Sequence, residues 1–156
     1  DAAQPLMARL LCRLGYPRRP AWKWSAKPGE VSAGRARLLT PDGDRYADEL
    51  WWRRERPELA MGPGSWGWVG AGLASMAALR RNGVLEAVET PVLLLSVRGD
   101  ALVSAPAISR AAARLPRSEH LAFGREAYHE VLREADRVRD RALAAIDDFL
   151  DRALAR

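Results

Sequence analysis

Hydrophobic residues follow two different spacings along the chain. In the first half, apolar residues recur every three or four positions, the spacing of one helical face. This spacing predicts helices over residues 5–15, 42–57 and 65–82, with Thr40 or Asp42 capping the second and Ser65 the third. Residues 16–34 are rich in Pro and Gly, so we expect an irregular loop there with at most a short turn of helix. Trp22 and Trp24 are expected to hold this loop in place.

The second half opens with a run of branched aliphatic residues. Residues 92–95 are Val-Leu-Leu-Leu, with Pro91 before them and Gly99 and Asp100 after them. Such a run without polar alternation predicts a strand buried on both faces. A helix is predicted over residues 105–115, a short strand over 119–123 and a last helix over 136–155. The apolar face of the last helix is predicted to carry Ala142, Leu143, Ile146, Phe149 and Leu150.

The order of elements predicts an α/β fold in two parts. Residues 1–84 form a helical region that holds all six tryptophans, and residues 85–156 form a strand–helix–strand–helix unit. Two strands alone do not make a stable parallel sheet, because both faces and both edges need cover. We therefore expect the chain to be the end of a larger fold.

Positive charge is concentrated near the start of the chain. The formal net charge is +5, and the segment from Arg9 to Arg37 carries eight basic residues against Glu30 alone. Almost all of the basic residues are arginine, which favours a compositional bias of the source genome. A surface that meets anionic lipid headgroups is the functional alternative. No nucleic-acid-binding motif accompanies the charge, so nucleic acid is not an expected partner.

The sequence gives little support for a disulfide, a nucleophilic cysteine, a metal site or a membrane-spanning helix. Cys12 is the only cysteine, so it cannot form an internal disulfide, and its apolar helical setting favours a small core residue over a nucleophile. The two histidines lie on different segments without clustered carboxylates, which argues against a metal site. No apolar run approaches the roughly 20 residues that span a bilayer. We expect no cofactor.

Asp100 and His129 are the candidate chemical groups. Asp100 follows the first predicted strand, and His129 follows the second by a few residues. Parallel strands joined by one crossover lie side by side, so the loops at their carboxyl ends are neighbours. A carboxylate beside an imidazole can fix its tautomer and let it act as a general base. The simpler alternative is a loop-capping aspartate and an unrelated surface histidine.

The motifs around these two residues resemble those of α/β-hydrolases. Residues 91–95 and 99–103 resemble the acid-bearing strand and loop, and residues 128–134 with Asp136 and Arg139 resemble the histidine loop. His129-Glu130 with its Leu-x-Glu continuation is similar to bacterial lysophospholipases and monoacylglycerol lipases. Further segments resemble the helical cap of the lysophospholipase L2 type: Leu39-Thr40 with Asp42, Arg45 and Tyr46, residues 57–62, and Trp66-Gly67-Trp68. Pro5-Leu6-Met7 resembles the segment just after the strand that follows the nucleophile.

One family feature is missing from this sequence. Enzymes of this kind carry a Gly-x-Ser-x-Gly nucleophile elbow ahead of the acid and the histidine. Ser65 has Gly67 after it but Pro63 before it, and Ser32 has Gly34 after it but Glu30 before it. Ser65 is better interpreted as a helix cap. The chain therefore resembles the C-terminal half of such a hydrolase, with the N-terminal half, its serine and its oxyanion loop absent.

The resemblance implies a carboxylic-ester hydrolase that uses a Ser-Asp-His triad, to which this chain supplies Asp100 and His129. It implies a lipid ester as substrate, such as a lysophospholipid or a monoacylglycerol. Most of the six tryptophans are expected to pack the core of the helical half, and Trp66 and Trp68, next to the Gly-Pro-Gly break, are the candidate substrate-binding residues. We expect a bacterial protein in the cytoplasm or at the periphery of the inner membrane. The alternatives are a non-catalytic fragment that binds lipid or a partner and, last, an Arg-rich nucleic-acid binder.

Overall fold

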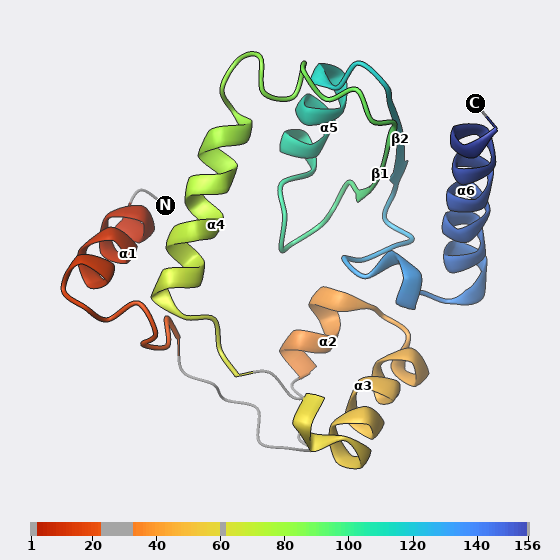
Figure 1. Ribbon diagram of the computed structural model, residues 1–156. Helices are drawn as coiled ribbons and strands as arrows, with labels where there is room; N and C mark the ends of the chain where they lie inside the picture. Colours follow the sequence, from red (N-terminus) through yellow and green to blue (C-terminus); the bar gives the residue numbers. More distant parts are fainter. Residues whose placement is uncertain (1–2, 23–32, 60–61, 156) are drawn as a thin grey trace.

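The computed structural model describes residues 3–22, 33–59 and 62–155. Within them, helices and strands follow in the order shown in Figure 1. The first part holds α1 (Ala3–Arg13), α2 (Ala33–Leu39), α3 (Gly43–Glu55), the 3₁₀ turn η1 (Pro57–Leu59) and α4 (Trp66–Leu79). The second part holds β1 (Val92–Val97), α5 (Ala105–Arg114), β2 (Ser118–Phe123), η2 (Val131–Arg133) and α6 (Asp136–Leu154).

The sheet of the described chain consists of β1 and β2, paired in parallel from Val92 opposite Ser118 to Val97 opposite Phe123. Helix α5 connects the two strands, and α5 and α6 lie on opposite sides of the sheet (Figure 1). This confirms the predicted strand–helix–strand–helix order. Because the strands are parallel and in register, the loops that follow Val97 and Phe123 leave the same edge of the sheet.

The main core lies between the sheet and α6. Alternate residues of a strand point to the same face, so Leu95 and Val97 share a face with Leu121 and Phe123. Phe123 is completely buried there. The α6 side and the loop after β2 complete this core with Ala127, Val131, Val138 and Ala142.

Two predictions about burial are corrected by the structure. Residues 92–95 of β1 are only partly buried, and burial is complete only at Ser96 and Val97. Among the described residues β1 pairs with β2 alone, so one of its edges has no neighbouring strand. On α6, Leu143 and Leu150 are 41% and 46% exposed. The apolar face of this helix is wider than the part of it that packs on the sheet, where Val138 and Ala142 are buried.

Capping residues set the helix ends in the first half. Gly15 adopts a φ of 85°, and its N–H and that of Tyr16 bond back to Cys12 and Leu11, a Schellman end for α1. Asp42 caps α3 by accepting the Arg45 N–H at 3.0 Å, and Ser65 caps α4 by accepting the Trp68 N–H at 3.2 Å. The predicted ends of these helices are confirmed to within a few residues.

Helix α2 was not predicted: the sequence placed residues 16–34 in an irregular loop with at most a short turn of helix and assigned no element to residues 35–39. Its seven residues are mostly Ala, Arg and Leu, all good helix formers, but a Gly within it and the Pro-rich segment before it concealed the signal. The turns η1 and η2 were not predicted either, since three residues carry no periodicity. Trp24 lies outside the described residues.

Arg114 connects α5 to the end of α4. Its guanidinium donates to the carbonyls of Leu79 and Arg81 at 2.9 and 2.6 Å and to the carboxylate of Glu86 at 2.8 Å. The hydrogen bond from Arg114 lowers the pKa of Glu86 to about 2. At the other end of α4, the N–H groups of Trp66 and Gly67 donate to the carbonyls of Arg19 and Pro17.

Phe123→Ala is expected to lower the free energy of unfolding by about 3–5 kcal/mol, because it removes a wholly buried ring from the core beneath α6. Urea unfolding followed by circular dichroism measures the loss. Leu154→Ala is the matched control, since Leu154 is 80% exposed and should change stability by less than about 0.5 kcal/mol. Equal losses in the two variants would contradict this placement of the core.

Candidate active site

Asp100 is held rigidly at the carboxyl end of β1. One carboxylate oxygen, Oδ1, accepts the backbone N–H groups of Leu102 and Val103 at 2.7 and 3.0 Å. An aspartate that accepts the N–H groups of the second and third residues after it stabilises a tight turn, and Asp is common at such positions for this reason. The side chain is 4% exposed, and its second oxygen, Oδ2, remains for another partner.

That partner is His129. The imidazole Nδ1 lies 2.8 Å from Asp100 Oδ2, and the histidine side chain is 32% exposed. Since Nδ1 meets a carboxylate, the neutral ring carries its proton on Nδ1 and its lone pair on Nε2. The structure therefore brings together the two residues that the sequence singled out, with a geometry in which Nε2 can accept a proton.

The environment favours the ionised form of Asp100. Burial by itself raises the pKa of this carboxyl group, but the hydrogen bonds from His129, Leu102 and Val103 together outweigh it. The net pKa of Asp100 is therefore lowered from its ordinary value. A carboxylate that is ionised at neutral pH stabilises a positive charge on the imidazole beside it.

The loop that carries His129 is bound to the corner between α2 and α3. The N–H of Glu130 donates to the carbonyl of Leu39 at 2.9 Å, and the hydroxyl of Thr40 donates to the carbonyl of Arg133 at 3.0 Å. In the sequence, Leu39-Thr40 stood out as part of the family resemblance and Thr40 as a candidate helix cap. Their contact with the histidine loop was not predicted, since no periodicity links segments about ninety residues apart.

The two candidate substrate-binding residues lie at the start of α4. Trp68 is 68% exposed and makes an edge-on contact with Trp22, with ring centroids 6.3 Å apart. Trp66 is partly buried and is bound through its backbone to residue 19. Their described contacts are with the 17–22 segment, and their role toward a substrate stays a prediction.

A second histidine contact was not expected from the sequence. The hydroxyl of Ser96 on β1 lies 2.8 Å from His120 Nε2 on β2. These two side chains occupy the face of the sheet opposite the α6 core, because Ser96 alternates with Val97 and His120 with Leu121. Ser96 is 5% exposed and lies within a strand rather than at a strand-to-helix turn, so the pair is a cross-strand hydrogen bond and not a nucleophile elbow.

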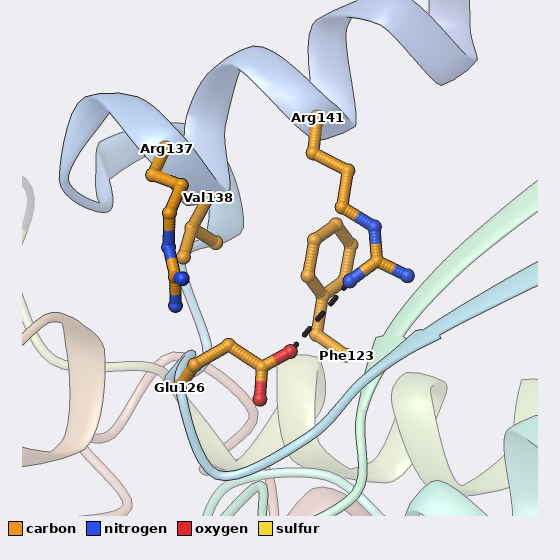
Figure 2. Close-up of a pocket in the computed structure, with 5 residues that line it drawn as sticks. All are labelled: Phe123, Glu126, Arg137, Val138 and Arg141. Atoms are coloured by element: carbon orange, nitrogen blue, oxygen red, sulfur yellow. Dashed lines mark ion pairs between the residues drawn. The ribbon is translucent and has the colours of Figure 1, made fainter.

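A hollow of about 340 Å³ lies on the α6 side of the sheet. Figure 2 shows Arg137, Val138 and Arg141 of α6 facing Phe123 and Glu126 across it. The guanidinium of Arg141 lies 4.9 Å from the Phe123 ring centroid and 3.7 Å from Glu126. Neither Asp100 nor His129 lines this hollow, so it is separate from the acid–histidine pair.

Residues 3–22, 33–59 and 62–155 contain no group of three or more His, Cys, Asp or Glu side chains placed to hold a metal ion. No helix in these ranges has the length and apolar character needed to cross a bilayer. Ser65 caps α4, as expected, and Ser32 lies outside the described residues.

No protein-family model matches the chain, and no curated protein matches it. Among solved structures, the chain is similar to a crystal structure of a soluble variant of monoglyceride lipase from Saccharomyces cerevisiae in complex with a substrate analog. The TM-score is 0.66 at 15% sequence identity, and the match covers 97% of this chain and 49% of that chain. The chain thus has part of an α/β-hydrolase fold and spans about half the length of that lipase.

Asp100→Asn is expected to remove a pH-dependent part of the stability. Because the folded-state pKa of Asp100 is lowered, its stabilising effect is complete above the unfolded pKa of about 4 and is lost as the pH falls through the folded value. Urea unfolding of both proteins should therefore show a difference at pH 6 that shrinks below about pH 4. A difference independent of pH would contradict the ionised, hydrogen-bonded state of Asp100.

Proposed function

We propose that this chain is the acid- and histidine-bearing part of a serine carboxylic-ester hydrolase of the lysophospholipase or monoacylglycerol lipase type. The observation that carries the proposal is the 2.8 Å contact between His129 Nδ1 and Asp100 Oδ2 at the carboxyl edge of two parallel strands. The likeness to a monoglyceride lipase supports it, because that protein has the same fold over nearly the whole of this chain.

In the proposed reaction, a serine outside this chain attacks the acyl carbonyl of the ester. His129 Nε2 takes the proton of the serine and then gives it to the departing alcohol. In the second half, water attacks the acyl-serine, and His129 moves the proton from water to the serine. Asp100 remains ionised, keeps the proton of the neutral ring on Nδ1 and stabilises the charged imidazolium. No cofactor is needed for these steps.

The proposed substrate is a lipid ester, a lysophospholipid or a monoacylglycerol. Residues 1–84 would form a cap over the reacting centre, and residues 85–156 would form the part of the core that holds Asp100 and His129. Helix α4 supports this division because it is strongly apolar and yet contains no fully buried residue. Apolar surface of this kind, with Trp66 and Trp68 at its start, suits an acyl chain.

In a protein that joins this chain to its serine-bearing segment, His129→Ala and Asp100→Asn are each expected to lower kcat for a monoacylglycerol by roughly 10⁴-fold, because either change disables the proton transfer. Release of fatty acid measures the rate. His120→Ala is the matched control, since His120 contacts Ser96 on the face of the sheet opposite the α6 core. This substitution should leave the rate nearly unchanged.

Near-normal turnover in the His129 and Asp100 variants would refute the triad assignment. The isolated chain offers a second check, because a fluorophosphonate reacts with activated serines. Without an elbow serine, the 156-residue chain should not be labelled, and labelling of Ser96 or Ser65 would contradict the proposed division of the triad.

A second candidate function is lipid binding without catalysis, with contact at the periphery of a membrane. Helix α1 favours it, because Leu6, Met7 and Leu10 are between 46% and 67% exposed. Arg9 and Arg13 lie on the same helix. An apolar helical face flanked by arginines suits the boundary between lipid headgroups and acyl chains.

Leu10→Asp is expected to weaken sedimentation of the chain with vesicles of phosphatidylcholine and phosphatidylserine by several-fold, since it places a charge on this apolar face. Leu150→Asp on α6 is the matched control, because Leu150 at 46% and Leu10 at 53% are similarly exposed. Equal binding by the two variants would remove α1 as the lipid contact.

A further inference from the structure

Glu134 is a buried acid that the proposed reaction does not use. It is 1% exposed, and the described residues that are both buried and polar or charged are Thr40, Ser96 and Glu134. Burying a carboxyl group without hydrogen bonds is costly, so its contacts show what holds it there. They all involve the loop that carries His129 or the corner between α2 and α3.

The carboxyl group of Glu134 fixes the residue just before the histidine. Its Oε1 accepts the backbone N–H of Tyr128 at 2.6 Å, which closes the loop of residues 128–134 over the turn η2. On the other side of the histidine, the N–H of Glu130 donates to the carbonyl of Leu39 at 2.9 Å. His129 is thus the residue between two anchored backbone N–H groups.

The α2–α3 corner holds the far end of the same loop. Thr40, which is 2% exposed, donates to the carbonyl of Arg133 at 3.0 Å and accepts the N–H of Asp42 at 3.1 Å. The guanidinium of Arg133 in turn donates to the carbonyl of Arg45 at 3.1 Å and to Glu49 at 3.2 Å. The histidine loop therefore rests on the end of α2 and on α3 by both backbone and side-chain bonds.

We propose that Glu134 is a positioning residue for His129, and that the α2–α3 corner completes the hold through Leu39 and Thr40. The imidazole must point Nδ1 at Asp100 to within a few tenths of an ångström, and two fixed backbone anchors beside it restrict the loop to that placement. This inference rests on the proposed function, because the placement matters only if His129 transfers a proton.

The electrostatics of Glu134 fit this role. Burial raises the pKa of its carboxyl group, the hydrogen bond from Tyr128 opposes that rise, and the nearby charge of Asp42 adds to it. An apolar side chain of similar size would fill the same space without this cost. The loop therefore requires the acceptor oxygen of Glu134 and not merely the volume of its side chain.

The test measures exchange with water of the proton shared between His129 Nδ1 and Asp100, by NMR on the ¹⁵N-labelled 156-residue chain. Glu134→Leu is expected to speed the exchange about tenfold, the effect of losing one hydrogen bond to a buried group. Glu134→Gln keeps an acceptor oxygen and should restore the slow exchange. Glu126→Leu is the matched control, since Glu126 accepts the Gly124 N–H at 3.0 Å and pairs with Arg141 at 3.7 Å, ahead of the loop of residues 128–134.

Unchanged exchange in folded Glu134→Leu, or equal acceleration in the Leu and Gln variants, would overturn the proposal. If Glu134→Leu does not fold, Thr40→Val carries the test, because it removes the hydroxyl that donates to Arg133 and accepts the Asp42 N–H. Slow exchange in Thr40→Val would then overturn the role of the corner. Absence of the shared proton from the unaltered chain would instead contradict the Asp100–His129 pair and with it the proposed function.

Discussion

The parallel pairing of β1 with β2 is the constraint on which the rest of the second half depends. Its register places Val97 opposite Phe123, so the two following loops leave one edge and Asp100 meets His129. Parallel strands need a crossover, which α5 supplies on one face, while α6 covers the other. The apolar residues between the sheet and α6 fix the strands, and the strands fix the loops.

Two acids near His129 show how the local environment, rather than the residue type, decides the chemistry. Glu134 is buried and the side chain of Asp100 is 4% exposed, yet the pKa of Asp100 is lowered and that of Glu134 is raised. Asp100 accepts hydrogen bonds at both oxygens, from two backbone N–H groups and an imidazole. Glu134 accepts the backbone N–H of Tyr128 and lies beside the hydroxyl of Thr40. The negative charge of Asp42 raises its pKa. The first is suited to holding a charge and the second to holding a loop.

Among the described residues, the helical first half contacts this site through the end of α2 and through α3. The α2–α3 corner contacts the histidine loop, whereas α1 and α4 pack on each other, with Ala8 fully buried at their contact. Much of their remaining apolar surface is exposed, including Met76 and Leu79 on α4. A cap that binds the histidine loop firmly and presents apolar surface elsewhere would connect substrate contact to the placement of the base.

The sequence by itself determined the local features: the strands, the cap at Ser65, a cap at Thr40 or Asp42, and the two residues of the acid–histidine pair. These follow from signals within a few residues, namely aliphatic runs, capping side chains and loops at strand ends. Only the tertiary structure decided which surfaces are covered, so the burial of β1 and the exposed leucines of α6 were predicted wrongly. It also decided that Thr40 holds the histidine loop, because a contact across about ninety residues leaves no periodicity in the chain. The role of Glu134 depends on its burial and on its bond to the Tyr128 N–H, and both come from the folding of the loop around it.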